Sequence, residues 1–583
     1  MSPLAAYLRR IRALAREGAA PGHLLATVVA VLADERGAEV ELHGHAVDGV
    51  PAAAVLPPAS LRSPWLLGHA HEALLDPGRR RRDGAHYTPP AVARGLVSFA
   101  REGIAAGATT RCCDPAVGGG AFLLAAAEAL AVEDADRARV VGECCYGIDV
   151  DPLAVQVTRA ALELWAGERV PSLHDHLVVA DALIDDRWSG AFDLVVGNPP
   201  FQNQLEAGTA RSRDLVDALR SRLGPLVTGY VDTAALFLLR GLELAAPSGR
   251  IALIQPQSSL GARDAAALRR DLLDRATLRG VWFAPEAVFR AGVRVWAPVL
   301  DRAQAHDDRA PIARRAGADF AAAPPVRRTR SALAATWGPV VADLCGVPAV
   351  HLASRGRIGD LATATAGFRD QFYGLIGAVV DADDADTDLP RLVTSGLIDV
   401  LRCTWGQRAA RFAGQRYERP VVRLEATTDT AGAWVRAQLR PKLMVATQTR
   451  VLEVAVDEVG VAVPSTPVIA VHPHEPSRLW HLAAALSAPP VTAYALTLAA
   501  GAALSTNAVK LAARQVLDLP LPSTGTAWDQ GAAIARTVAG DTNTHLRHAR
   551  LAELGAVMCE AYGVDPDPVL AWWLGRVPPS RTS

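Results

Sequence analysis

A strand-like segment that ends in an asparagine and two prolines is the part of this sequence best suited to chemistry. Residues 192–197 form an apolar run typical of a buried strand, and Asn198-Pro199-Pro200-Phe201 follows directly. An exocyclic amine on an aromatic base is a poor nucleophile, because the ring delocalises its lone pair. The Asn198 side-chain oxygen and the Pro199 carbonyl oxygen can accept both N–H groups of such an amine and localise that lone pair. Pro199 and Pro200 fix the backbone, and Phe201 offers a ring on which a base can stack.

A glycine-rich turn precedes this segment. Residues 114–122 read Asp-Pro-Ala-Val-Gly-Gly-Gly-Ala-Phe between a strand-like and a helical segment. Glycines let the backbone approach a ligand, and a helix start offers free N–H groups. Such a turn alone is weak support, since many nucleotide-binding folds use one. One βα unit later, Asp149 is suited to pair with ribose hydroxyls, whereas Asp151 precedes Pro152 and is better placed to start a helix. Asp181 follows a third strand and is suited to accept a hydrogen bond from an adenine amino group.

The elements that must position these residues are short β-rich runs alternating with helical segments rich in Ala and Leu. The predicted strands are Thr109–Cys113, Cys145–Val150, Leu177–Ala180, Phe192–Val196, Arg250–Gln255 and Val293–Leu300. This alternation predicts an α/β fold with a mostly parallel, doubly wound sheet. Ligands of such folds gather beyond the carboxyl ends of the strands, where the motifs lie.

The length of 583 residues exceeds one ordinary core and predicts several domains. We expect a helical cap over 1–80, the α/β domain over 81–310, and a boundary rich in Ala, Arg, Asp and Pro over 311–345. A mixed α+β region over 346–525 and a helical tail over 526–583 complete the chain.

The overall composition predicts no general attraction to nucleic acid, because the net charge is −1. The seven cysteines contain no C-x-x-C spacing, and the first residues lack the apolar segment of a secretory signal. An apolar stretch near 488–504 is interrupted by Pro489 and Pro490 and predicts a buried helix. We therefore expect a cytoplasmic protein that does not enter a membrane.

Together the motifs resemble the gamma class of amino-methyltransferases, the TaqI-type and type IIG-like N6-adenine DNA methylases. Tyr87-Thr88-Pro89-Pro90 matches a motif that precedes the glycine-rich turn in that class. The resemblance implies a Rossmann-like S-adenosylmethionine-dependent methyltransferase domain followed by a target-recognition domain. It also implies site-specific methylation of adenine N6 in double-stranded DNA, as the modification component of a restriction-modification or phage-defence system. The target base must leave the duplex to reach such a pocket.

The resemblance also implies roles for individual residues. Asn198, Pro199, Pro200 and Phe201 would be catalytic. S-adenosyl-L-methionine would be bound by Tyr87, Thr88, Asp114, Pro115, Ala116, Gly118, Gly120, Phe122, Asp149, Val150, Asp181 and Ala182. Phe289, in the segment 286–293, would stack on the flipped base opposite Phe201, although a buried core phenylalanine is the alternative. Two departures from the family pattern are Phe201, where tyrosine is commoner, and Gly119 between the two other glycines of the turn.

A basic region follows the predicted boundary. Residues 402–450 carry ten basic and three acidic side chains, with four aromatic residues among them. Phosphate contacts would explain this local excess, and a solvated basic face is the alternative. The predicted DNA-contacting residues are Arg402, Arg408, Arg411, Arg416, Arg436, Arg440 and Lys442.

Three alternatives remain open at the level of sequence. An RNA adenine or a protein glutamine methyltransferase also suits an Asn-Pro-Pro-aromatic motif, and a non-catalytic DNA-binding subunit of a defence complex is a third possibility. The chain has no Pro-Cys dipeptide for C5-cytosine methylation and no convincing Pro-Asp…Glu-x-Lys nuclease pattern. We therefore expect modification without cleavage and no metal, with any nuclease or helicase partner encoded separately.

Overall fold

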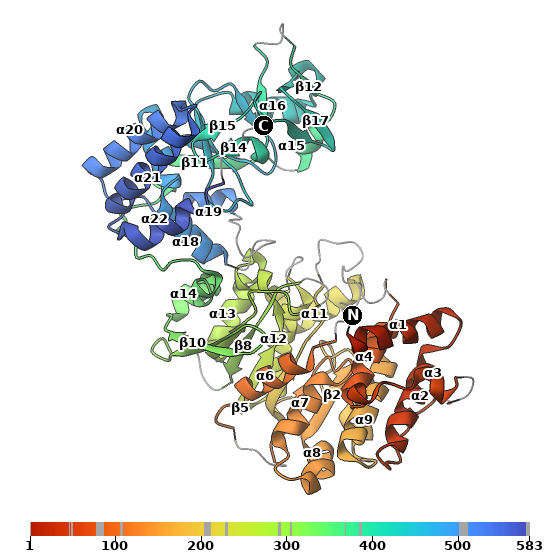
Figure 1. Cartoon of the computed structure of the whole chain (residues 1–583). Helices are drawn as coiled ribbons and strands as arrows, with labels where there is room; N and C mark the ends of the chain where they lie inside the picture. The colour runs from red at the N-terminus through yellow and green to blue at the C-terminus, as the bar shows by residue number, and fades with distance from the viewer. Residues whose placement is uncertain are drawn as a thin grey trace. The chain divides into compact units, whose positions relative to one another are not determined.

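The computed structural model describes residues 2–45, 47, 50–76, 78, 87–104, 109–202, 212–227, 231–289, 293–302, 306–367, 369–383, 388–500 and 511–578 (Figure 1). The chain divides into two compact units, Met1–Val340 and Val341–Ser583.

One large sheet forms the centre of the first unit. Within the described residues it has ten strands, in the order β10-β9-β7-β8-β5-β4-β1-β2-β3, with β6 paired to β8. The strands are β1 (Cys112–Asp114), β2 (Cys145–Asp149), β3 (Leu177–Val179), β4 (Phe192–Gly197), β5 (Ala245–Leu253), β6 (Gln255–Pro256), β7 (Thr277–Phe283), β8 (Val295–Asp301), β9 (Ile312–Ala316) and β10 (Ala321–Val326). Strands β1 to β5 are mutually parallel, and β8 is antiparallel to both β5 and β7. The predicted mostly parallel sheet is therefore confirmed.

The strand order reverses between β1 and β4. The chain runs outward from β1 through β2 to β3, then returns to pair β4 on the other side of β1. Since crossover connections are right-handed, the helices after β1 and β2 cover one face of the sheet and the helix after β4 covers the other. The connections that leave the paired ends of β1 and β4 therefore run to opposite faces of the sheet and leave a crevice, which is where open α/β sheets bind ligands.

The helices of the first unit fall into an N-terminal group and a group that connects or flanks the strands of the sheet. The former are α1 (Pro3–Arg16), α2 (Pro21–Asp34), α3 (Ala52–Val55) and α4 (Trp65–Leu74). The latter are α6 (Pro90–Ala100), α7 (Ala121–Leu130), α8 (Arg137–Cys144), α9 (Pro152–Ala166), α10 (Leu173–His176), α11 (Arg213–Leu223), α12 (Thr233–Leu244), α13 (Ala266–Arg275) and α14 (Arg330–Ala335).

The N-terminal helices belong to the core of the sheet domain. Helix α4 contacts α7 and α9 (Figure 1). Leu25 and Leu67 are fully buried in the same hydrophobic cluster as Leu123 of α7. The predicted cap is therefore not a separate domain, because its apolar faces are buried against the helices of the sheet.

The boundary predicted at 311–345 is wrong over its first half. Strands β9 and β10 extend the sheet to Val326, and Arg314 of β9 is only 2% exposed. The Arg314 guanidinium donates hydrogen bonds to the carbonyl oxygens of Pro324 (2.6 Å) and Val340 (3.0 Å). Arg314 thus stabilises the segment 312–326 through hydrogen bonds to backbone carbonyl groups, although the composition of this segment resembles that of a linker.

Two small sheets and a helical layer build the second unit. One sheet has the order β11-β22-β19-β20, the other β12-β18-β13-β21, and β14-β15 and β16-β17 pair as two-stranded sheets. Their bounds are β11 (Ala362–Ala366), β12 (Val379–Asp381), β13 (Arg391–Val393), β14 (Ile398–Asp399), β15 (Arg402–Cys403), β16 (Ala410–Phe412), β17 (Gln415–Tyr417), β18 (Pro420–Val422), β19 (Lys442–Val445), β20 (Val454–Asp457), β21 (Ala462–Pro464) and β22 (Ile469–Pro473). The helices are α15 (Arg369–Gly374), α16 (Asp429–Gln438), α17 (Leu479–Leu486), α18 (Pro489–Ala499), α19 (Ala513–Leu517), α20 (Thr526–Gly540), α21 (Thr544–Ala561) and α22 (Pro566–Leu574).

The C-terminal helices pack within this unit, since α20 contacts α17, and α22 contacts α18. Most of the apolar residues of α18 are buried. In the described part of the chain, no single helix is long and apolar enough to cross a membrane. Helices α17 and α18 reach that length only when they are taken together, and the chain bends by 67° between them.

A buried ion pair joins β19 to β20. Lys442 is fully buried, and its Nζ donates to Asp457 Oδ2 at 2.5 Å. Asp457 also accepts the backbone N–H groups of Gly460, Val461 and Ala462. The predicted contact between Lys442 and DNA is therefore wrong, because this ammonium group is turned into the core to hold the chain after β20.

We expect Lys442→Ala to lower the free energy of unfolding by about 3–5 kcal/mol, because it leaves the Asp457 carboxylate buried without its cation. Urea denaturation measures the change. Arg416→Ala removes an arginine from an exposed pair with Glu418 and is the control, with little expected effect. A Lys442→Ala protein as stable as the wild type would contradict the role given to this pair.

Candidate active site

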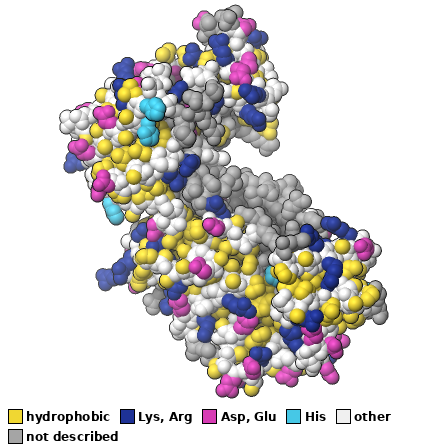
Figure 2. All heavy atoms as spheres, in the orientation of Figure 1, with side chains coloured by type: hydrophobic (Ala, Val, Ile, Leu, Met, Phe, Trp, Pro, Cys, Tyr) yellow, Lys and Arg dark blue, Asp and Glu magenta, His cyan; other side chains and the backbone are white. Residues whose placement is uncertain are grey.

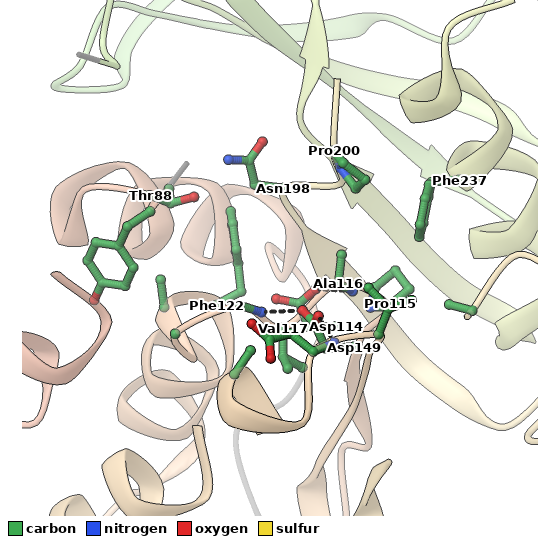
Figure 3. Close-up of a pocket in the computed structure, with 18 of the residues that line it drawn as sticks. Thr88, Asp114, Pro115, Ala116, Val117, Phe122, Asp149, Asn198, Pro200 and Phe237 are labelled. Carbon is green, nitrogen blue, oxygen red and sulfur yellow. Dashed lines mark hydrogen bonds between the residues drawn. The ribbon is translucent and has the colours of Figure 1, made fainter. Parts of the chain in front are cut away.

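A cavity of about 240 Å³ lies at the carboxyl ends of β1 to β4. Figure 3 shows Thr88, Asp114, Asn198, Pro200 and Phe237 around it. The predicted residues that line it are Tyr87, Thr88, Asp114, Pro115, Ala116, Gly118, Phe122, Asp149, Val150, Asp181, Ala182, Asn198 and Pro200. The fold thus brings the glycine-rich turn and the Asn-Pro-Pro segment, some 80 residues apart in sequence, to one cavity. Gly120, Pro199 and Phe201 do not line it.

Asp114 lies at the centre of the crevice between β1 and β4. Its side chain is 1% exposed, and Oδ1 accepts the Ala116 N–H at 2.9 Å. Burial, with a smaller contribution from Asp149, raises the pKa of Asp114 to about 8. A Cβ on Gly197 would lie 2.5 Å from Asp114 Oδ1. Glycine at the end of β4 therefore leaves the space that the Asp114 carboxyl occupies.

The glycine-rich turn presents backbone to the cavity. Gly118 and Gly120 adopt positive φ values of 49° and 80°, a region that side chains other than glycine rarely occupy. Gly120 precedes α7, and among the described residues no side chain caps the first N–H groups of that helix. Free N–H groups at a helix start suit a carboxylate ligand such as the carboxyl group of an amino acid.

Asp149 ends β2 beside this turn. The Gly118 N–H donates to Asp149 Oδ2 and the Asp151 N–H to Oδ1, both at 2.9 Å. Burial raises the pKa of Asp149, and these two hydrogen bonds oppose the shift. The carboxylate is thus held in one orientation at the cavity wall and keeps lone pairs for a diol. Asp151 accepts the Leu153 N–H and caps α9, as predicted.

Val150 and Asp181 form an apolar and a polar wall where the adenine of the predicted cofactor would bind. Val150 is 62% exposed and lines the cavity, which leaves a bare apolar surface for a flat ring. Asp181 Oδ1 accepts the Leu183 N–H at 3.0 Å, and burial raises the pKa of Asp181.

The side chains that line the cavity carry acidic groups, and their charge distinguishes between possible nucleotide-like ligands. Of the described residues that line the cavity, none is lysine or arginine, and five are acidic: Glu72, Asp114, Asp149, Asp151 and Asp181. A dinucleotide or a nucleoside triphosphate would bring phosphates to an acidic wall. S-adenosylmethionine instead carries a sulfonium and an ammonium group, so the donor set fits this cofactor.

The N-terminal helices complete the cavity, which the sequence did not reveal. Gly68, His71, Glu72 and Leu75 line it from α4 and the residue after it. A Cβ on Gly119 would overlap the Gly68 backbone, and one on Gly68 would overlap the Tyr87 ring. The Tyr87 hydroxyl donates to the Trp65 carbonyl oxygen at 3.1 Å. Tyr87 therefore contributes mainly by locking α4 onto the glycine-rich turn.

Helix α12 supplies a further wall that was not predicted. Phe237 is 5% exposed and lines the cavity, and Thr233 Oγ donates to Gln202 Oε1 at 2.9 Å. No local motif marks these residues, because α12 is apolar along most of its length and its cavity-facing side depends on how it packs.

The two predicted stacking rings lie in or against the core. Phe289 is 7% exposed within the hydrophobic cluster, Phe201 packs partly buried against that cluster, and neither lines the cavity. Residues 290–292 of the matching segment lie outside the described residues. The stacking roles of Phe201 and Phe289 remain predictions.

The predicted DNA-contacting arginines of the second unit differ in their surroundings. Arg411, Arg416, Arg436 and Arg440 are exposed. Arg408 is partly buried and pairs with Asp399 at 3.0 Å, and Arg402 donates to Gln407. Acidic and basic side chains are interspersed on the face seen in Figure 2, in keeping with the near-zero net charge.

Residues 62–312 match the family model described as N-6 DNA Methylase. The type I restriction enzyme MjaIX methylase subunit of Methanocaldococcus jannaschii is 27% identical over 181 residues, 30% of this chain and 30% of that protein. The type II methyltransferase M.XamI of Xanthomonas campestris pv. amaranthicola is 32% identical over 146 residues, 24% of each chain. The matches thus span less than a third of these relatives. The predicted family resemblance is confirmed for this region, and the family match implies S-adenosylmethionine as the cofactor.

The fold extends to solved structures over most of the chain. The type IIL restriction-modification enzyme MmeI, solved in complex with DNA, superposes with a TM-score of 0.58 at 13% identity, covering 90% of this chain and 83% of that one. The DrdV–DNA complex gives 0.50 at 12% identity, covering 84% and 60%. The predicted fold, a Rossmann-like methyltransferase domain with a helical N-terminal part and an additional C-terminal domain, is confirmed.

We expect Gly197→Ala to weaken S-adenosylmethionine binding roughly tenfold or more, because the added methyl group forces the buried Asp114 carboxyl to shift, at a cost of about 1–3 kcal/mol. Titration calorimetry measures the affinity. Gly540→Ala, where an added Cβ meets nothing within 4 Å, is the matched control. Unchanged affinity in Gly197→Ala would show that the Asp114 position does not matter for the cofactor.

Proposed function

We propose that this protein transfers the methyl group of S-adenosylmethionine to N6 of an adenine in DNA, within a restriction-modification or phage-defence system. The observation that carries the proposal is the presence of Asn198 on the same cavity as Asp114, Gly118 and Asp149. A planar amine held by Asn198 would adjoin a cofactor held by the turn and by Asp149. The relatives reported above are restriction enzymes and methyltransferases, which favours DNA as the substrate.

In the proposed reaction the protein orients both reactants. Bound in the cavity, S-adenosylmethionine supplies an electrophilic methyl group. Asn198 Oδ1 and the Pro199 carbonyl oxygen accept the two N6–H groups of an adenine turned out of the duplex. The N6 lone pair forms the new N–C bond while the S–C bond breaks, and one N6 proton leaves to solvent. The products are N6-methyladenine and S-adenosylhomocysteine, and no covalent enzyme intermediate is needed.

The hairpin of β16 and β17 supports DNA as the partner of the second unit. Arg411 and Arg416 are directly opposite each other in its register, and both are exposed. Like charges opposite each other destabilise a hairpin by a few tenths of a kcal/mol or more, and the exposed pair of Arg416 with Glu418 offsets part of that repulsion. Ala410 and Phe412 are buried, which fixes the arginines on the outer face. A two-stranded ribbon with two outward arginines suits the DNA major groove and its phosphates.

We expect Asn198→Ala to reduce methyl transfer by about 10²–10³-fold, because it removes one of the two acceptors, while S-adenosylmethionine affinity stays near that of the wild type. Labelled cofactor is offered with duplex DNA, RNA or protein, and DNA is digested to nucleosides to identify N6-methyladenine. Transfer to RNA or protein but not DNA would contradict the proposal and favour the alternatives. Full activity of Asn198→Ala would exclude its catalytic role.

We expect the double variant Arg411→Gln, Arg416→Gln to weaken DNA binding and to lower the slope of log affinity against log salt by about 2, since each phosphate contact contributes about 0.9. Binding is measured by fluorescence anisotropy at several salt concentrations. The control variant Arg514→Gln, Arg536→Gln removes two exposed arginines from α19 and α20. An unchanged slope in the hairpin variant would exclude the hairpin from the DNA interface.

A further inference from the structure

A second cavity, of about 640 Å³, lies within the second unit and has no part in the reaction described above. It opens between the β14 strand, the loop from β19 to β20, and the residue Pro578. The residues around it are Ser395, Gly396, Ile398, Asp399, Arg408, Thr447, Gln448, Thr449, Arg450, Glu453, Pro467 and Pro578.

Glu453 is the polar group that this cavity leaves unexplained. It is 6% exposed, and among the described residues none donates a hydrogen bond or forms an ion pair with its carboxyl group. Burial, reinforced by the nearby Asp399, raises the pKa of Glu453 to about 8. Its position on the cavity wall leaves this carboxyl group able to accept a hydrogen bond from a ligand.

The charges around Glu453 narrow the chemistry of that ligand. Arg408 is held by Asp399 through contacts of 3.0 and 3.3 Å, and Arg450 is exposed at the same cavity. No described group of three or more metal-ligating side chains exists, which disfavours a metal ion. A phosphate would meet the buried Glu453 carboxyl. A neutral ligand that offers an N–H donor fits best.

The loop that carries Thr447, Gln448, Thr449 and Arg450 is bonded to the protein at its ends and at Thr447. Gln448 has φ of 66°, an uncommon conformation for a residue other than glycine, and it is exposed at the cavity. The loop ends are fixed by the pairing of Val445 with Val454, and the Thr447 hydroxyl donates to the Pro467 carbonyl oxygen. Strained conformations held by their surroundings are typical of ligand-contacting loops.

We propose that this cavity reads an amino-bearing nucleobase of the DNA target, cytosine first, with Glu453 as the acceptor for the exocyclic amino group. The proposal rests on the proposed function, because DNA is the partner that presents such a group. A carboxyl group accepts from cytosine N4, whereas amide side chains pair with adenine. Gln448 and Arg450 line the same cavity as Glu453 and are suited to contact the neighbouring base.

The test is selection of bound duplexes from a randomised DNA library by the full chain, followed by sequencing. Glu453→Gln keeps the size of the side chain and replaces the carboxyl with an amide. We expect the wild type to require cytosine at one position that Glu453→Ala tolerates as any base, with discrimination reduced at least about tenfold. Glu453→Gln should shift that position toward adenine. Glu475→Gln, an exposed glutamate of the same unit, is the control.

The outcomes separate this inference from the proposed function. A wild-type protein that selects no sequence, or variants that select the wild-type sequence with equal discrimination, would overturn the inference. If thermal denaturation shows that Glu453→Ala is not folded, the base selected by the nearly isosteric Glu453→Gln variant tests the inference instead. A protein that selects the predicted base through Glu453 but forms no N6-methyladenine would overturn the proposed function and leave the inference standing.

Discussion

The close approach of the β1 and β4 ends is the constraint on which the candidate active site depends. Asp114 and Gly197 end the two strands at which the sheet order reverses, and only a residue without a side chain leaves room for the buried Asp114 carboxyl. If the two strand ends were further apart, Asn198 would no longer line the same cavity as the turn after β1. In the proposed reaction that shared cavity aligns the substrate amine with the methyl donor.

The buried carboxyl groups and the packing of α4 both determine which ligand suits this crevice. Burial makes the carboxyl groups of Asp114 and Asp149 costly to ionise, as their raised pKa values indicate. A cationic ligand relieves that cost, whereas a phosphate would increase it. The wall that excludes solvent comes partly from α4, which Gly68 and Tyr87 hold against the turn. The N-terminal helices are thus part of the site and of the core at once.

Basic residues in segments of similar composition can be either buried in the core or exposed on the surface of this protein. Arg314 and Lys442 lie in segments that composition assigns to a linker and to a DNA-contacting surface, yet both are buried and bonded within the protein. Arg411 and Arg416 come from the same basic region and remain on an outer face. A local charge count cannot separate these cases, because the side of the strand on which each residue falls depends on its pairing partners.

The sequence by itself determined the features that depend on short segments: the first five strands along the chain, the turn at 118–120, the helix cap at Asp151, and the strand-end positions of Asp149 and Asn198. These follow from hydrophobic period, from glycine conformations and from proline stiffness, which act within a few residues. Tertiary structure alone decided the rest. It placed α4 and Phe237 on the cavity, buried Lys442, and made Gly280 part of strand β7, where an added Cβ would meet the Phe99 ring. Those outcomes depend on which distant surfaces pack together, and no local pattern encodes that choice.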